Sequence, residues 1–172
     1  MMNLKDKIRV VQDFPMPGIR YRDITTLLKD GEAYRELLDR MHEYLSDKHI
    51  DLVAGPEARG FVIGAPLAYL LRAGFVPVRR PGRLPAEVYR YEYQIEQGRS
   101  DTLEVHKDAV QPGQRVVVVD DLLATGSTAL ATCQLLQRMG AQIVGVCFAM
   151  EMTMYSGREI LQEYDVFSAI KY

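Results

Sequence analysis

Two adjacent carboxylates followed by small and hydroxyl residues form the segment with the clearest potential for chemistry. Asp120 and Asp121 end the apolar run Val116–Val119, and the sequence TGST at residues 125–128 then opens an expected helix. Neighbouring charges at the end of a buried strand repel each other and lose hydration, so a compensating ligand is expected. Free backbone N–H groups at a helix start favour a phosphate. The segment therefore predicts a sugar-phosphate site.

The same residues have a plainer interpretation. Ser127 or Thr128 can cap the helix, and the two aspartates can stand in a solvated turn. Two common phosphate or nucleotide motifs are excluded, because no lysine follows Gly126 as in a Walker A loop and the chain has no G-x-G-x-x-G. On the residues alone, the sugar-phosphate site and the capped turn both remain open.

The segment Val116–Thr128, read VVVVDDLLATGST, closely resembles the signature with which type I phosphoribosyltransferases bind phosphoribosyl pyrophosphate (PRPP). It has the form found in the adenine-specific members. The resemblance implies that Asp120 and Asp121 bind the ribose 2′- and 3′-hydroxyls. It also implies that the 5′-phosphate is held by Ala124, Thr125, Gly126, Ser127 and Thr128.

The N-terminal region extends the resemblance over nearly the whole chain. Residues Asp13–Thr25 resemble a segment of the adenine-specific enzymes in which an aromatic residue and the backbone beside an arginine hold the base. The resemblance assigns Tyr21 and Arg22 to these positions, and an aromatic face stacked on a base typically contributes about 1–3 kcal/mol. The alternative is that Tyr21 packs in a core and Arg22 pairs with Asp23.

A second loop resembles the pyrophosphate loop of the family. It is the sequence GPEARG at Gly55–Gly60, with Arg59 as its cation. The resemblance implies a cis peptide bond between Glu57 and Ala58. An arginine fork beside a helix start suits a pyrophosphate. An ordinary turn with a surface arginine is the alternative.

Arginines gather shortly after this loop. Residues 72–90 hold five arginines and one acid, Glu87, in a chain of net charge −2. Such a positive patch suits the highly anionic PRPP, so Arg79, Arg80 and Arg83 are assigned to PRPP binding. A solvated basic face is the alternative. Arg80 and Arg83 stand where many relatives have lysine, so the local binding geometry is expected to differ.

Residues 81–113 are rich in proline and glycine, which predicts an exposed flap or hairpin outside the core. The resemblance places the catalytic acid/base within it, at Glu96, which would move the purine's proton as N9 attacks ribose C1′. Flap closure would exclude water. Two features depart from the family: Gln97 replaces the usual tyrosine, and the flap has one extra residue. Glu92 and Glu104 therefore remain alternatives.

Hydrophobic periodicity predicts the elements that position these residues. Helices are expected at residues 31–47, 60–72 and 128–139, and strands at 50–54, 75–78, 116–119 and 143–149. This alternation predicts an α/β fold with a central, mostly parallel sheet flanked by helices and a ligand site at one sheet edge. The resemblance adds a small N-terminal hood (1–30) and a projecting flexible flap (81–113) within one domain, 1–172.

Composition limits the class of protein. Of the 172 residues, 48% are hydrophobic and 26% charged, as in a soluble globular domain. The net charge gives no field that attracts nucleic acid, and no apolar run approaches the ~18 residues of a membrane span. Cys133 and Cys147 fit no metal or redox spacing and are expected to be reduced core thiols. We expect a cytoplasmic protein without a dedicated metal site.

The expected reaction is adenine + PRPP → AMP + pyrophosphate, with Mg²⁺ carried by PRPP. The family is commonly homodimeric. The nearest alternative is the same transfer to a 6-oxopurine such as hypoxanthine, guanine or xanthine. A PRPP-sensing regulator that binds DNA is a further alternative, although only about 30 residues precede the first expected helix and no basic recognition helix is visible.

Overall fold

The computed structural model describes residues 2–95 and 98–172. Contacts within the chain divide it into two compact parts, residues 1–40 and 41–172. Each part is described by itself.

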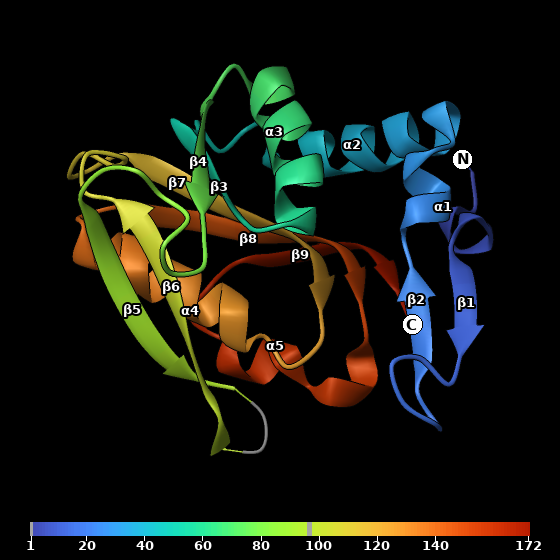
Figure 1. Cartoon of the computed structure of the whole chain (residues 1–172). Coiled ribbons are helices and arrows are strands. Elements are labelled where there is room, and N and C mark those ends of the chain that lie inside the picture. Colours follow the sequence, from blue (N-terminus) through green and yellow to red (C-terminus); the bar gives the residue numbers. More distant parts are fainter. Residues whose placement is uncertain (1, 96–97) are drawn as a thin grey trace. The chain divides into compact units, whose positions relative to one another are not determined.

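The first part is built around a two-stranded antiparallel hairpin (Figure 1). Strand β1 (Arg9–Gln12) pairs with β2 (Arg20–Asp23). The 3-10 helix η1 (Leu4–Lys7) precedes the hairpin, and α1 (Thr25–Leu28) and α2 (Gly31–Leu45) follow it. The expected helix at 31–47 is confirmed as α2. The hairpin was not expected, because its short strands mix charged and apolar residues without a repeating pattern.

A parallel five-stranded sheet forms the centre of the second part, in the order β4-β3-β7-β8-β9. The strands are β3 (Leu52–Pro56), β4 (Gly74–Val78), β7 (Arg115–Leu123), β8 (Gln142–Glu151) and β9 (Val166–Lys171). The α/β fold with a central parallel sheet is confirmed. The four expected strands correspond to β3, β4, β7 and β8, whereas β9 has no counterpart among them.

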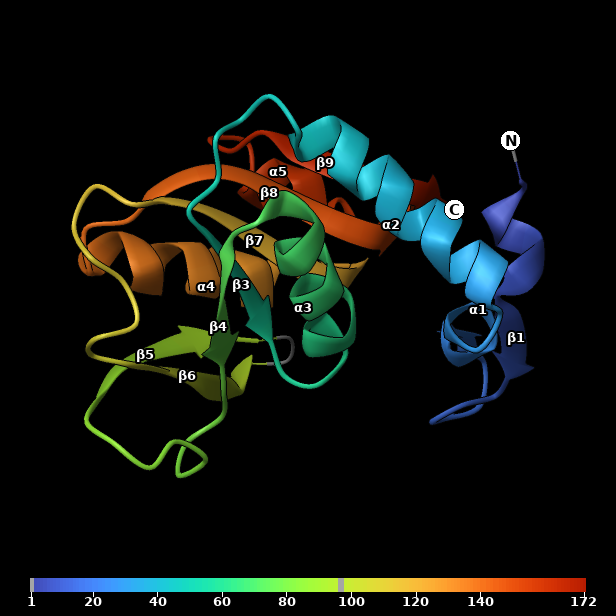
Figure 2. The ribbon, with the colours of Figure 1, turned by 90° about the horizontal axis from the view of Figure 1, so that it is seen from above.

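Two crossover helices flank this sheet. Helix α3 (Arg59–Leu71) joins β3 to β4, and α4 (Ser127–Arg138) joins β7 to β8. Figures 1 and 2 show α3 on one face of the sheet and α4, with the short helix α5 (Gly157–Ile160), on the other. Covered faces on both sides explain why the strands are so apolar.

The core of the second part centres on β7. Val116–Val119 are fully buried, as is Phe148 on the neighbouring strand β8. Cys133 on α4 and Cys147 on β8 are free, buried thiols, which confirms the expected core role. Burial raises the pKa of Cys133 to about 12 and also raises that of Cys147.

The segment expected to be an exposed flap contains a second antiparallel hairpin, formed by β5 (Val88–Gln94) and β6 (Ser100–His106). Leu103 on β6 is only 3% exposed. The hydroxyl of Tyr91 on β5 donates a hydrogen bond to Gln134 on α4. The expectation that the whole segment lies outside the core is therefore wrong, because one face of the hairpin packs against α4.

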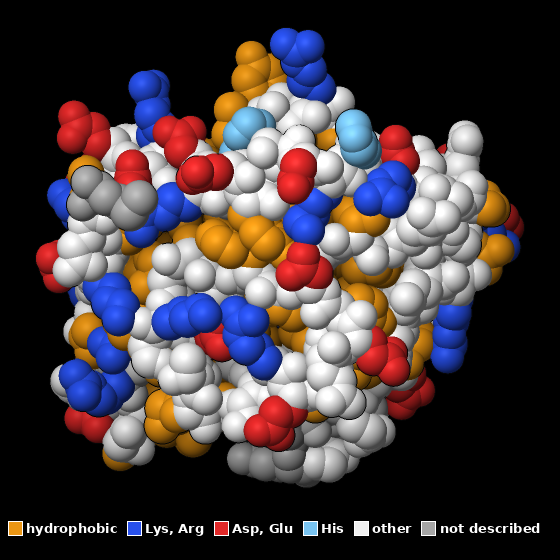
Figure 3. All heavy atoms as spheres, turned by 180° about the vertical axis from the view of Figure 1, so that it is seen from behind, with side chains coloured by type: hydrophobic (Ala, Val, Ile, Leu, Met, Phe, Trp, Pro, Cys, Tyr) orange, Lys and Arg blue, Asp and Glu red, His pale blue; other side chains and the backbone are white. Residues whose placement is uncertain are grey.

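Charged side chains of both signs are interspersed with hydrophobic ones on the face shown in Figure 3. Neither sign dominates this face, in keeping with a net charge of −2. Across residues 2–95 and 98–172, no helix has the length and apolar character needed to cross a membrane.

Candidate active site

Strands β3 and β7 lie side by side and end at the same edge of the sheet. Because the two strands pair in parallel, the loop that follows β3 lies next to the loop that follows β7. The expected end of β7 at Val119 is wrong: the strand continues to Leu123, because its last residues still pair with β8. Asp120 and Asp121 therefore project from a hydrogen-bonded strand rather than from a loop.

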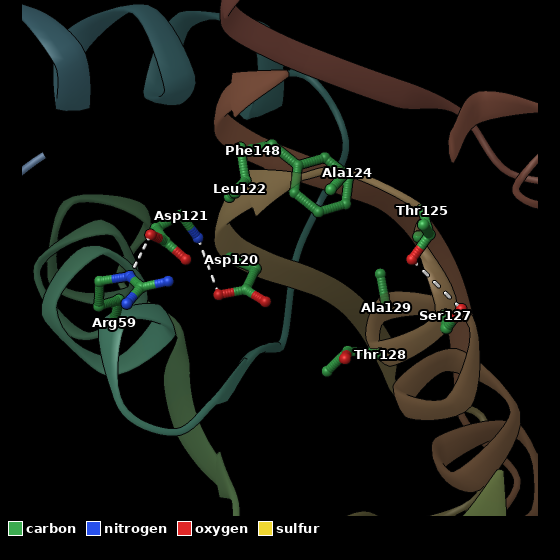
Figure 4. A pocket seen from close by; sticks show the side chains of 11 residues that line it. Arg59, Asp120, Asp121, Leu122, Ala124, Thr125, Ser127, Thr128, Ala129 and Phe148 are labelled. Atoms are coloured by element: carbon green, nitrogen blue, oxygen red, sulfur yellow. Dashed lines mark hydrogen bonds and ion pairs between the residues drawn. The ribbon is translucent and has the colours of Figure 1, made fainter. Parts of the chain in front are cut away.

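A cavity of about 210 Å³ lies between these carboxylates and the start of α4. Figure 4 shows Asp120 and Asp121 toward one end and Thr125 and Ser127 at the other. Every residue that the resemblance assigns to the ribose and the 5′-phosphate lines this cavity, namely Asp120, Asp121, Ala124, Thr125, Gly126, Ser127 and Thr128. The structure thus brings the whole segment to one site.

The start of α4 has the form of an anion-binding helix end. Its N-cap is Gly126, with a φ of 82° and no side-chain capping bond. The hydroxyls of Thr125 and Ser127 lie 3.4 Å apart beside it. The first N–H groups of a helix have no partner within the helix, so they suit a phosphate. The plainer interpretation, in which Ser127 or Thr128 caps the helix, is wrong.

The two aspartates differ in their surroundings. Asp121 is 5% exposed and forms an ion pair with Nε of Arg59. Asp120 accepts a hydrogen bond of 2.8 Å from the backbone N–H of Asp121. Burial, followed by the charge of Asp121, raises the pKa of Asp120 well above its usual value. A solvated turn is therefore wrong, and a ligand that compensates the charge of Asp120 is favoured.

A second cavity, of about 270 Å³, adjoins the first. The two cavities share Arg59, Asp120, Asp121 and Thr128. The further walls come from the end of β3 and the loop after it, from the chain beyond β4 and from the β5–β6 hairpin, namely Pro56, Glu57, Ala58, Arg80, Tyr93, Asp101 and Leu103. The peptide bond between Glu57 and Ala58 is cis, as the resemblance implies.

The arginines near this cavity are paired with carboxylates. Nε of Arg79 donates to Glu57 at 2.7 Å, and Nη2 of Arg80 lies 3.5 Å from a carboxylate oxygen of Asp101. Glu57 and Asp101 lie outside the window of residues 72–90 in which the sequence shows only one acid. Two arginines of the expected positive patch are therefore partly compensated by acids from elsewhere in the chain.

The four assigned arginines take different places. Arg59 and Arg80 line the cavities. Arg79 and Arg83 are not among the lining residues in the part of the chain that the structure describes, and Arg79 donates to the carbonyl of Arg83 at 3.2 Å. Arg79 instead contacts Glu57, which lies in the wall of the second cavity.

The expected acid/base, Glu96, lies outside the described residues, as does Gln97. Of the two alternatives, Glu104 is 1% exposed and accepts hydrogen bonds from Arg90 at 2.5 Å and from the backbone N–H of Gly82 at 3.0 Å. Glu92 lines a separate groove between β5 and α4. Neither alternative lines the two cavities that hold the aspartate pair.

The two residues assigned to the purine, Tyr21 and Arg22, lie on β2 in the first part of the chain. The rings of Tyr21 and Phe14 meet edge to face, with centroids 5.1 Å apart. Asp23, the expected alternative partner of Arg22, bonds Thr25 and Arg9, and these bonds lower its pKa to about 2.

Two residues of the second cavity were not singled out from the sequence. The hydroxyl of Tyr93 lies 3.2 Å from Oγ1 of Thr128, and Tyr93 faces Asp101 across the β5–β6 ladder. Tyrosines at residues 89, 91 and 93 share one face of a strand, and this repeat is the signal that identifies Tyr93. Asp101 carries no comparable signal.

Comparisons with known proteins agree on one family. Residues 23–170 match the family model described as the phosphoribosyl transferase domain. The chain is 54% identical over 171 residues to the adenine phosphoribosyltransferase of Alkaliphilus metalliredigens, covering 99% of this chain and 100% of that protein.

Solved structures give the same result. The adenine phosphoribosyltransferase of Thermoanaerobacter pseudethanolicus is 50% identical, with a TM-score of 0.94 over 98% of each chain. The Saccharomyces cerevisiae enzyme is 35% identical, with a TM-score of 0.88 over 96% of this chain and 95% of that one. The yeast structure is a complex with an imino-altritol bisphosphate and adenine.

Proposed function

Since the chain belongs to the adenine phosphoribosyltransferase family, we propose that it transfers the phosphoribosyl group of PRPP to adenine, giving AMP and pyrophosphate in purine salvage. The observation that carries the proposal is the pair of adjoining cavities at the edge of the sheet. The first cavity lies between the carboxylate pair and the N-terminus of α4, and the second adds Arg80 and the loop with the cis peptide bond. A ligand with a phosphate, a ribose and a pyrophosphate matches this sequence of groups.

Each part of PRPP has a matching set of side chains. The start of α4 would hold the 5′-phosphate, while Asp120 and Asp121 would accept hydrogen bonds from the ribose hydroxyls. Arg59 and Arg80 would bind the pyrophosphate. Fixing the ribose at both ends would present C1′ to the incoming base in one orientation, which lowers the entropic part of the barrier.

The cavity lining suits a substrate that brings its own cation. Among the residues that the structure describes, four carboxylates and two arginines line the two cavities, so acidic groups exceed basic ones, namely Glu57, Asp101, Asp120 and Asp121 against Arg59 and Arg80. Such an oxygen-rich lining fits Mg²⁺, which prefers hard oxygen ligands and retains waters. We propose that Mg²⁺ arrives on PRPP, where it would neutralise charge on the departing pyrophosphate.

The acceptor end completes the proposal. Attack by purine N9 on C1′ forms the new C–N bond as the bond to pyrophosphate breaks, and the N9 proton must leave. We assign this proton transfer to Glu96. Tyr21 and the backbone beside Arg22 would hold adenine by stacking and hydrogen bonds. We further propose that the enzyme is a cytoplasmic homodimer. Light scattering after size-exclusion chromatography would test the dimeric state.

A substrate panel tests the function. Purified protein is incubated with PRPP and Mg²⁺ and with adenine, hypoxanthine, guanine or xanthine in turn, and nucleotide formation is measured. AMP should form fastest. Preferred formation of a 6-oxopurine nucleotide would replace adenine with that base, and no nucleotide from any base would refute the transferase assignment.

Two variants test the assigned residues. The double substitution Asp120→Asn with Asp121→Asn should abolish measurable PRPP binding in a folded protein, with the exposed Asp108→Asn as the matched control. Glu96→Ala should lower kcat far more than it raises KM, with the exposed Glu163→Ala as its control. Normal PRPP binding by the first variant, or unchanged turnover by the second, would contradict the corresponding role.

A further inference from the structure

A short C-terminal segment lies directly against the loop that precedes α4. We call Ser156–Leu161, which contains α5, the buttress segment. A Cβ atom added at Gly157 would stand 2.1 Å from the carbonyl oxygen of Ala124. A Cβ atom added at Gly126 would stand 2.8 Å from the carbonyl oxygen of Gly157. The two backbones therefore touch at both glycines, with no room for a side chain between them.

The buttress segment also contacts the loop through a side chain. Cγ1 and Cδ1 of Ile160 lie 3.2 and 3.3 Å from the position of a Cβ atom at Gly126. Ile160 is 42% exposed, so this contact accounts for part of its burial. Gly126 is the N-cap of α4, so Ile160 packs against the residue at which the helix begins.

The buttress segment is itself fastened to the sheet. Nε and Nη2 of Arg158 each donate to a carboxylate oxygen of Glu151 at 2.8 Å, and Nη1 donates to the carbonyl of Val166 at 2.9 Å. Glu151 is 4% exposed and faces Leu123 across the β7–β8 ladder, one residue before the loop. A two-bond arginine–carboxylate pair fixes orientation as well as distance. The segment is thus a rigid support.

We propose that Gly157 and Ile160 are positioning residues that set the affinity of the site for the 5′-phosphate. Neither residue lines the two cavities in the described part of the chain, so each acts through the loop Ala124–Gly126. By holding this loop, they aim the N–H groups at the start of α4 at the phosphate. The inference rests on the proposed function, because it takes the phosphate of PRPP as the ligand there.

The expected effect follows from the contact distances. Real Cβ atoms essentially never approach another atom closer than 3.0 Å, so an alanine at residue 157 must push the Ala124 carbonyl away by about 0.9 Å (3.0 − 2.1). Hydrogen bonds to phosphate oxygens span only ~2.7–3.2 Å, and a misplacement of ~1 Å in a site costs up to about 100-fold. Gly157→Ala should therefore raise the Kd for a 5′-phosphate at least about tenfold.

Two ligands separate this role from a general loss of structure. Ribose 5-phosphate reports on the first cavity, and pyrophosphate with Mg²⁺ reports on the arginine side of the second. Calorimetric titration should show a Kd for ribose 5-phosphate raised at least about tenfold in Gly157→Ala, with the Kd for pyrophosphate changed less than about twofold. Gly145→Ala is the matched control, because a Cβ atom there meets nothing closer than 3.6 Å.

A second variant decides the matter if Gly157→Ala does not fold. Ile160→Ala removes the side-chain contact and should raise the Kd for ribose 5-phosphate about threefold, with the exposed Met154→Ala as its control. An equal loss of affinity for both ligands, or an unchanged affinity for ribose 5-phosphate, would overturn this inference and leave the proposed function standing. Failure of the unaltered protein to bind ribose 5-phosphate would overturn the inference, whereas the proposed function is overturned only if the protein also forms no nucleotide from PRPP.

Discussion

Replacing Asp120 by asparagine should stabilise the unliganded protein at neutral pH while weakening its affinity for PRPP. The substitution keeps the shape of the side chain and an oxygen that accepts the 2.8 Å hydrogen bond from the N–H of Asp121. It removes a negative charge that burial and the neighbouring carboxylate both disfavour. The charged carboxylate of Asp120 is therefore expected to lower the stability of the unliganded protein and to strengthen substrate binding.

The pH dependence fixes the sign of the stability change. Folding raises the pKa of Asp120 above 3.8, the ordinary value of an aspartate side chain. Between that value and the folded-state pKa, the folded protein keeps a proton that the unfolded chain releases, so the free energy of unfolding falls as pH rises through the interval. The difference between Asp120→Asn and the unaltered protein should vanish below pH ~3.8 and grow toward neutral pH.

The expected gain is on the order of 1 kcal/mol, because Asp120 is half-buried and its carboxylate already accepts the hydrogen bond from the N–H of Asp121. For a chain of this size each kcal/mol corresponds to roughly 2–4 °C in Tm. Losing a charged partner of a ribose hydroxyl costs about 1.5–3 kcal/mol, so the Kd for PRPP should rise by about 10- to 150-fold.

Urea unfolding at acidic and neutral pH measures the first effect, and calorimetric titration with PRPP and Mg²⁺ measures the second. The exposed Asp108→Asn should change neither quantity. A variant at Asp120 that is less stable than the unaltered protein at neutral pH, or equally stable at every pH, would refute the reasoning about its buried charge. An unchanged Kd for PRPP would refute its role toward ribose.

Three further predictions concern other residues. Tyr93→Phe should raise the KM for PRPP a few-fold in initial-rate measurements, because it loses a hydrogen bond to Thr128 worth about 1 kcal/mol. Glu104→Ala should lower the free energy of unfolding in urea by about 2 kcal/mol, since it removes a buried side chain and the charged acceptor of the hydrogen bonds from Arg90 and from the backbone N–H of Gly82. Cys133 should react with a thiol reagent at pH 8 only after unfolding, because it is buried and its pKa is raised to about 12; rapid labelling of the folded protein would contradict this.

Local sequence patterns predicted the strongest elements of the fold but not their limits. The unbroken β-branched run Val116–Val119 is sufficient to predict a buried strand. The extension of that strand to Leu123 depends on pairing with β8, which is distant in sequence. Strand β9 (Val166–Lys171) depends on the same strand for its place in the sheet. Hydrogen bonding between strands decides these boundaries, and single-segment patterns do not contain it.

The site shows the same division. Residues 120–128 are close in sequence, so a motif that names them also predicts that they share a cavity. The partners of the arginines come from elsewhere: Glu57 for Arg79 and Asp101 for Arg80. The support of the loop by Gly157 depends on a contact more than thirty residues away in sequence. The motif residues therefore predict which side chains line the site, but not which distant residues hold those side chains in place.

The carboxylates that accompany the cavity arginines bear on which anions the proposed site would accept. Arg59 and Arg80 each face a carboxylate of the same chain, Asp121 and Asp101 respectively. A single inorganic phosphate or sulfate must compete with a carboxylate that the fold keeps beside the arginine at high effective concentration. PRPP carries phosphates at both ends of one ribose, so binding at one end favours binding at the other. On the proposed function, these internal counterions would favour a ligand that carries several phosphates, and a single phosphate would compete only weakly for the site.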